Sequence, residues 1–117
     1  MAATFLRKYG TAVSGVTSID IPLIKAGVTN FAVGADFTPV AGDIVISRDG
    51  GSYGNINNLP TAITAGNTAV WRFLLTNTEV QAAQTKVVIS DAATKAIEDD
   101  YFIVEFFGNI SGMHSVD

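Results

Sequence analysis

The sequence predicts an all-β protein, an immunoglobulin-like antiparallel β-sandwich of about seven strands with one short helical turn. Three observations lead to this prediction. Apolar and polar residues alternate along much of the chain, as they do in half-buried strands. Gly, Asn, Asp and Pro interrupt the alternation at intervals of roughly 8 to 12 residues, which is the turn spacing of an antiparallel β-protein. The chain has 117 residues, of which 48% are hydrophobic, enough for one core and too few for two.

Composition also indicates how the domain behaves. Only 15% of the residues are charged, so little keeps the surface of a monomer soluble, and self-association or assembly is favoured. We expect residues 1–15 to form an N-terminal arm or an edge strand, residues 16–110 to form the β-sandwich domain, and residues 111–117 to form a C-terminal tail.

The first half of the chain predicts two strands. In "GVTSIDIPLIKAG" the alternation places Ile19, Ile21 and Leu23 on one face, and Pro22 assigns this strand to the edge of a sheet. A short segment at 31–33 and a turn at 38–42 follow. The next strand is expected at 44–47, with Ile44 and Ile46 on one face.

The second half gives stronger patterns. "AVWRFLLT", at 69–76, is too hydrophobic for a solvated strand and is expected to be central. "NTEVQAAQ" contains helix formers and a capping signal in Asn77 or Thr78, so we expect one or two helical turns crossing between the sheets. "KVVIS" and "DYFIVEFFG" are predicted as strands. The latter places Tyr101, Ile103, Glu105 and Phe107 on one face and Phe102, Val104 and Phe106 on the other.

The stretch "SRDGGSYGNINN" is explained by turn chemistry. Asp-Gly-Gly supplies the positive φ angles of a tight hairpin or bulge at little steric cost. A calcium loop is the functional alternative, but its spacing misses the EF-hand pattern and no glutamate closes it. The glycines do not follow the GxGxxG spacing of a nucleotide site. The oxygen donors of the calcium alternative would be Asp49, Ser52, Asn55 and Asn57.

Catalytic chemistry is not indicated by the remaining polar residues. Glu98, Asp99 and Asp100 offer carboxylates, but only Glu98 and Asp100 share a face of an extended chain, and a solvated strand entry explains them better. His114 lies in "HSVD", where consecutive tail residues cannot hold a catalytic triad. With no cysteine and one histidine, thiolate and multi-histidine metal sites are excluded. We therefore expect no enzyme, no catalytic or metal site and no cofactor.

Partners are constrained by charge and hydropathy. A formal charge of −4 without a basic stripe predicts no nucleic-acid binding. No apolar run approaches the roughly 20 residues of a membrane span, so no membrane partner and no secretion are expected. Trp71, Tyr53 and Tyr101 are the candidates for a sugar-stacking platform, although the core is the favoured place for Trp71. Asn109 begins "NIS", a glycosylation acceptor that is expected to be idle without a secretory signal.

Several blocks, taken together, resemble a class of small tailed-bacteriophage virion proteins. The matching blocks contain "ADFTPVAGDIVISRDGG", "LPT", "LTNTEVQA" and "DAATKAIEDDYFIVEFFGN", in that order, followed by a tail with His114. The resemblance covers roughly residues 26–114 and is more specific than any single motif. Arg48 stands where the class usually has lysine and Ile97 where it usually has an aromatic residue.

The resemblance implies a structural protein without catalytic activity. Our preferred interpretation is a capsid decoration or cement protein on the surface of the virion, bound in many copies to the major capsid protein and in contact with other copies of itself. The alternative is an accessory module of the tail, neck or baseplate, with a host carbohydrate as a less favoured partner. The N-terminal arm, if it reaches a neighbouring subunit, would contact it through Phe5, Leu6, Arg7, Lys8 and Tyr9.

Overall fold

The computed structural model describes residues 2–10, 12–13, 15, 17–91 and 95–107. These residues form eight strands in two sheets and one 3-10 turn, which confirms the predicted all-β sandwich. The elements in chain order are β1 (Ala2–Lys8), β2 (Ile19–Ile21), η1 (Gly34–Asp36), β3 (Ile44–Arg48), β4 (Gly54–Asn55), β5 (Thr61–Ala65), β6 (Thr68–Phe73), β7 (Gln84–Ile89) and β8 (Asp100–Phe107).

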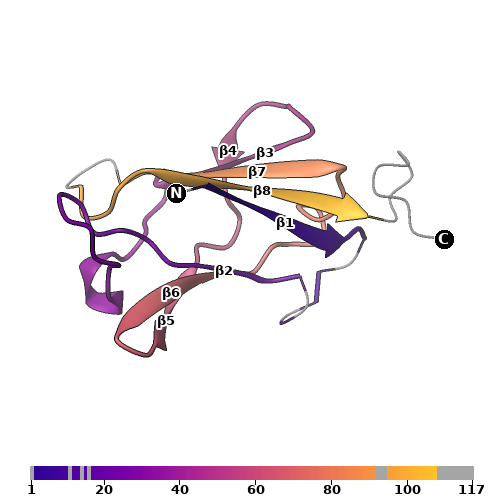
Figure 1. Ribbon diagram of the computed structural model, residues 1–117. Helices are drawn as coiled ribbons and strands as arrows, with labels where there is room; N and C mark the ends of the chain where they lie inside the picture. Colours follow the sequence, from indigo (N-terminus) through magenta and orange to yellow (C-terminus); the bar gives the residue numbers. More distant parts are fainter. Residues whose placement is uncertain (1, 11, 14, 16, 92–94, 108–117) are drawn as a thin grey trace.

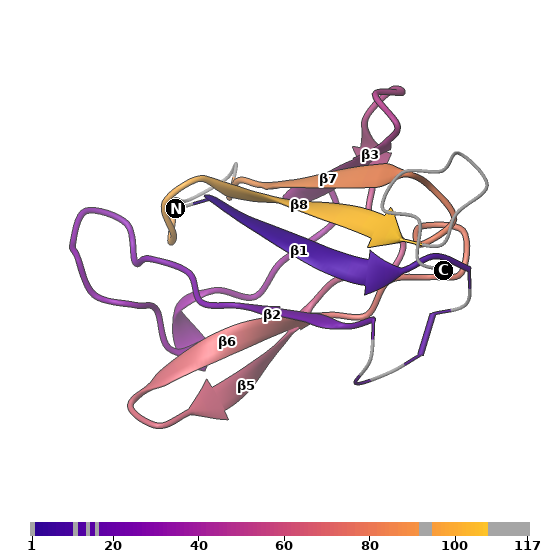
Figure 2. The ribbon, with the colours of Figure 1, turned by 45° about the vertical axis from the view of Figure 1, so that its right-hand side comes forward.

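The two sheets form separate layers. One has five strands in the order β1-β8-β7-β3-β4, and the other has three in the order β2-β6-β5. Figure 1 shows the five-stranded sheet above the three-stranded one, and the turned view in Figure 2 shows the β5–β6 hairpin projecting from the lower layer. All strand pairs are antiparallel except β1 and β8, which run parallel. That parallel pair is the one departure from the predicted antiparallel arrangement.

The core follows from strand alternation. Phe102, Val104 and Phe106 of β8 are fully buried, as are Val87 and Ile89 of β7. Side chains alternate across a strand, so their neighbours in sequence face outward, as predicted for β8. The two sheets meet where the rings of Phe73 and Phe102 pack edge to face, with centroids 5.0 Å apart.

The predicted edge and central strands are confirmed. Ile19, Ile21 and Leu23 are buried on one face, and β2, at the edge of its sheet, ends immediately before Pro22. The strand predicted at 69–76 is β6, which is central in the three-stranded sheet. Its Trp71 is fully buried in the core beside Phe37.

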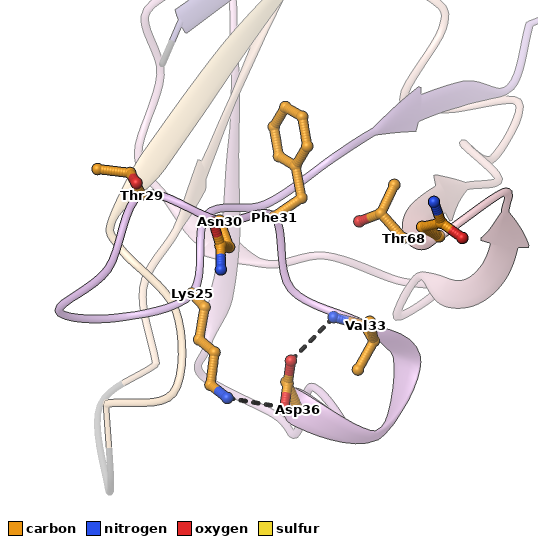
Figure 3. Close-up of a pocket in the computed structure, with 8 residues that line it drawn as sticks. Lys25, Thr29, Asn30, Phe31, Val33, Asp36 and Thr68 are labelled. Carbon is orange, nitrogen blue, oxygen red and sulfur yellow. Dashed lines mark hydrogen bonds and ion pairs between the residues drawn. The ribbon is translucent and has the colours of Figure 1, made fainter.

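The one or two helical turns predicted at 77–84 are reduced to a single hydrogen-bonded turn, in which the Val80 N–H donates to the Thr76 carbonyl at 3.1 Å, and no helix forms. In the described chain the single 3-10 turn is η1, where the backbone N–H of Val33 donates to the Asp36 carboxylate at 2.9 Å (Figure 3). The segment 74–83 does cross between the sheets, but as turns. A helix would join the Ala83 N–H to the Glu79 carbonyl; instead Ala83 donates to Asp49, and the carbonyl accepts from Thr85.

Asp-Gly-Gly forms the expected hairpin turn between β3 and β4. Asp49 and Gly50 have φ of 51° and 76°, and the Gly51 N–H donates to the Arg48 carbonyl at 2.9 Å. Positive φ at both central residues matches the twist of the flanking strands. The Asp49 carboxylate also accepts the backbone N–H groups of Ala83 and Gln84, at 3.0 and 2.9 Å. The turn therefore also fixes the start of β7.

Substitution of Phe5 tests whether β1 packs as an edge strand on this domain rather than extending to a neighbouring subunit. Its ring packs edge to face on Phe102 at 5.8 Å, whereas the neighbouring Leu6 points outward. Truncating Phe5 to Ala removes a core contact and should lower the free energy of unfolding by about 2–3 kcal/mol, less than for a fully buried Phe. Leu6→Ala, the matched control, should change it by about 0.5 kcal/mol or less. Urea unfolding measures both. Equal effects would contradict the inward packing of β1.

Candidate interaction surface

The outer face of the five-stranded sheet carries a row of apolar side chains. Strand register places Val45 opposite Val88, and Val88 opposite Tyr101. Ile103 lies two residues farther along β8 on the same face, opposite Thr4 of β1. Leu6 of β1 projects from this face one pair farther along, opposite Glu105. We call the set Leu6, Val45, Val88, Tyr101 and Ile103 the outer strip.

The outer strip is accessible and has a charged margin. Leu6 and Tyr101 are 52% and 43% exposed, and the other three are half-buried. The ammonium group of Lys86 lies 4.9 Å from the centroid of the Tyr101 ring, so the ring is held beside a cation. An apolar surface with a polar margin on a rigid sheet is typical of a protein-binding face.

The structure divides the five predicted contact residues between two faces. Phe5 and Tyr9 pack against the core, and Arg7 also lies on the inner face of β1, because it shares the parity of Phe5. Leu6 and Lys8 are exposed on the outer face. Ala2–Lys8 is therefore an edge strand of this domain, and of the five predicted contact residues only Leu6 and Lys8 are on its outer face.

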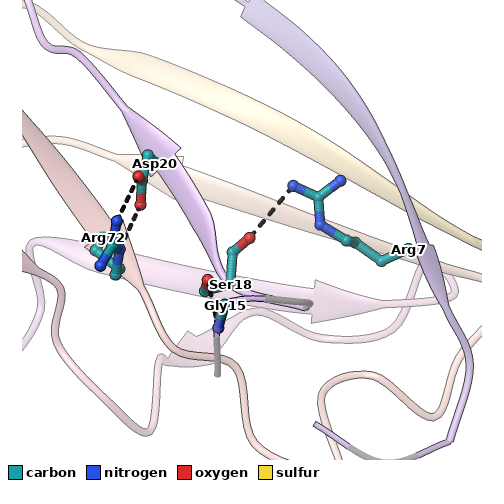
Figure 4. A network of polar contacts seen from close by, with 5 residues as sticks. All are labelled: Arg7, Gly15, Ser18, Asp20 and Arg72. Atoms are coloured by element: carbon teal, nitrogen blue, oxygen red, sulfur yellow. Dashed lines mark hydrogen bonds and ion pairs between the residues drawn. The ribbon is translucent and has the colours of Figure 1, made fainter. Parts of the chain in front are cut away.

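Arg7 links the edges of the two sheets. Its guanidinium reaches from β1 to the carbonyl of Ser18, just before β2, at 3.2 Å (Figure 4). Its Cζ lies 5.4 Å from the Phe5 ring centroid. In the three-stranded sheet, Arg72 makes two hydrogen bonds to Asp20, at 2.8 and 2.9 Å. This bidentate pair joins β2 to β6 directly opposite in register.

A pocket of about 530 Å³ opens at one end of the sandwich. Three segments surround it: the loop at 25–31, the η1 turn and the β5–β6 turn (Figure 3). Phe31 and Val33 supply exposed apolar surface, and Lys25 forms an ion pair with Asp36 at 3.6 Å. Thr29, Asn30, Asn67 and Thr68 complete the lining. None of these residues was singled out from the sequence as a site.

A second pocket, lined by Asn55, Asn57, Thr76 and Glu79 among others, contains a buried carboxylate that was not identified from the sequence. Glu79, 6% exposed, accepts the backbone N–H groups of Thr76 and Asn57 at 2.8 and 3.2 Å, while its own N–H donates to the Thr76 hydroxyl. This reciprocal pair is the capping box spacing, with Thr76 in place of the predicted Asn77 or Thr78. "TNTE" was the signal that would have found it. Glu79 fastens the loop after β4 to the crossing between the sheets.

The carboxylate of the calcium-loop alternative and the aromatic residues of the sugar-platform alternative do not line these two pockets. The Asp49 carboxylate is occupied by backbone N–H groups rather than turned toward Ser52 or Asn55. Trp71 is in the core, while Tyr101 is on the outer strip and Tyr53 is exposed in the β3–β4 loop. His114 and Asn109 lie outside the described residues.

The acidic run before β8 contains an ion pair. Asp99 is hydrogen bonded by Lys95 and by Ser90, and these contacts hold the pKa of its carboxyl group below the ordinary value. Across the described ranges, no three His, Cys, Asp or Glu side chains are grouped so as to hold a metal ion. In the same part of the chain no helix has the length and hydrophobicity needed to cross a membrane.

Comparisons with protein-family models, with curated proteins and with solved structures give no match to this chain.

Asp20 gives a prediction of pH dependence. The hydrogen bonds from Arg72 lower the pKa of the Asp20 carboxyl below 3.8, so the pair stabilises the fold above that pH and the contribution is lost as pH falls through the lowered value. Asp20→Asn should be less stable than the wild type at pH 7, and the difference should shrink between about pH 5 and pH 2. Urea unfolding at several pH values measures it. A difference that stays constant down to the lowest pH would contradict the assignment.

Glu79 gives a prediction of stability. Glu79→Ala leaves the N–H groups of Thr76 and Asn57 without their acceptor and should lower the free energy of unfolding by about 2–3 kcal/mol. Thr78→Ala, an exposed change in the same turn, should cost about 0.5 kcal/mol or less. Chemical denaturation of both variants is the measurement. A near-neutral Glu79→Ala would show that the two loops are held together by other contacts.

Proposed function

We propose that this chain is a non-enzymatic structural protein of a tailed-bacteriophage virion, and specifically a capsid decoration or cement protein bound in many copies to the head. The observation that carries the binding role is the outer strip, an apolar face on the larger of the two sheets. The virion context is supported by the ordered sequence blocks from Ala35 to Asn109 that resemble small phage virion proteins.

The geometry suits attachment to a protein lattice. The outer strip runs across β1, β8, β7 and β3, with Lys86 and Glu105 between its apolar residues, so a partner would contact a surface held by strand hydrogen bonds rather than a loop. The polar margin includes Lys8 and Lys86, which can pair with carboxylates on an acidic partner surface. Because each contact of this size is modest, repetition over a lattice would provide the avidity. The partner on this account is the major capsid protein.

A second candidate function is favoured by one observation, the pocket at 25–36 and 67–68. An exposed aromatic ring, Phe31, and a carboxylate, Asp36, gather there with two side-chain amides at one end of the sandwich. Amides and carboxylates present donors and acceptors to vicinal hydroxyls, so the lining suits a sugar. An accessory module of the tail, neck or baseplate that binds host carbohydrate would use this pocket, and glycan binding at about millimolar affinity would support it.

The outer strip can be tested by charge substitution. Leu6→Glu places a carboxylate on the strip at a position that is 52% exposed, so the fold should persist while binding to heads that lack this protein falls at least tenfold. Tyr53→Ser, which removes a similarly exposed aromatic side chain from the β3–β4 loop, is the matched control and should bind like the wild type. Co-sedimentation with purified heads measures both. Undiminished binding by Leu6→Glu and by Tyr101→Glu would remove the outer strip as the contact surface.

A further inference from the structure

The two described sheets end in four edge strands, and three of them are protected against pairing with another chain. β4 has two residues, and β2 has three and is followed by Pro22. β1 is longer but carries an inward-facing charge, Arg7, and ends at Lys8. Short strands, proline and inward-facing charges are the means by which natural sheets block edge pairing.

The fourth edge, β5, is the least protected. Pro60 precedes it, as Pro22 follows β2, but the strand is longer than β2 and β4 and has no inward-facing charge. Thr61–Ala65 is five residues long, contains no charged residue and no proline, and four of its five residues are exposed. It lies at the end of the three-stranded sheet, in the hairpin that projects from the lower layer (Figure 2). Within the part of the chain that the structure describes, its backbone hydrogen bonds on one side to β6, and no bond to the other side is present.

The hairpin register identifies the backbone groups at the open edge. Gly66 and Asn67 form a two-residue turn, so Ala65 and Thr68 are a hydrogen-bonded pair, and so are the pairs two and four residues farther along the ladder. The N–H and C=O groups of the alternate residues, Ala62 and Thr64, therefore point away from β6. These two N–H and two C=O groups are available to another strand.

We propose that β5 pairs with β5 of a second copy of this chain, antiparallel and about a two-fold axis through Ile63. In this register Ala62 lies opposite Thr64 of the second copy, and Thr64 opposite Ala62 of the second copy. All the outward N–H and C=O groups are then paired, in four hydrogen bonds per dimer. Ile63 meets Ile63 of the second copy beside the half-buried Val70, and the two three-stranded sheets become one six-stranded sheet.

The second copy fits this edge because the strand is complementary to itself. Antiparallel pairing sets "TAITA" against its own reverse, so every opposed pair is Thr with Ala or Ile with Ile, and no charges oppose each other. The net charge of −4 on each chain is screened over about 8 Å at physiological salt. The paired strands are short, so they bury less area than a standard stable interface, which buries about 1,200 Å² or more. The dimer should therefore be weak, with a Kd of about micromolar to millimolar.

Sedimentation equilibrium of the full chain from about 1 µM to 1 mM tests the proposal, because these concentrations span the expected Kd. The wild type should show a reversible monomer–dimer equilibrium. Ala62→Pro removes an outward N–H that the strand does not use in its own ladder, and Ile63→Lys places two like charges at the two-fold axis; each should weaken the dimer at least tenfold. Leu6→Glu, on the outer strip, should leave the dimer Kd unchanged.

Amide hydrogen exchange of the wild-type protein provides a second readout, which stays informative even if the Ala62→Pro variant does not fold. In the wild type, protection of the Ala62 and Thr64 amides should increase with protein concentration, because the dimer buries those N–H groups. Three results would overturn the proposal: a monomer throughout the range, a dimer unaffected by Ile63→Lys, or a dimer lost only in Leu6→Glu. The last result would place self-association on the outer strip and would leave the head-binding role to be judged separately.

Discussion

The contact between the two sheets, where Phe73 packs against Phe102, is the constraint on which the other features depend. Once Phe102, Val104 and Phe106 face the second sheet, the period of two in a strand directs Tyr101 and Ile103 outward. The outer strip is therefore a consequence of the core, and its position is as rigid as the packing beneath it. A slip of one residue in β8 would bury Tyr101 and Ile103 and expose three core side chains, so the outer strip and the fold cannot be varied independently.

The loops are held by carboxylates that accept backbone N–H groups. Asp49 receives two such bonds from the start of β7, and Glu79 joins the loop after β4 to the crossing between the sheets. Each charged acceptor satisfies donors that an irregular backbone would otherwise leave unpaired. These bonds tie the loops at Asp49 and Glu79 to neighbouring segments, whereas β5 keeps an open set of backbone groups. This contrast supports a protein that acts by presenting surfaces.

Much of the fold could be predicted because its core strands alternate strictly, as in β2, β6 and β8. The strand β5 was missed because Thr and Ala carry little burial signal, although "TAITAGNTAV", with its two-residue Gly-Asn turn, was a hairpin pattern. The parallel pairing of β1 with β8 joins residues about as far apart as the chain allows, and local patterns do not report such pairings. For the same reason the pocket beside Phe31 and the bond from Asn57 to Glu79 could not be assembled from the sequence, whereas "TNTE" did signal the local pairing of Thr76 with Glu79.

The copy number of this chain in purified particles, relative to the major capsid protein and measured by quantitative mass spectrometry, tests the central claim most directly. A protein that decorates the head lattice through the outer strip should be present in a number comparable with that of the capsid subunits. A count matching only the few subunits of a neck, tail or baseplate ring would contradict the decoration role and favour the carbohydrate pocket. Absence from the particle would contradict a virion function altogether.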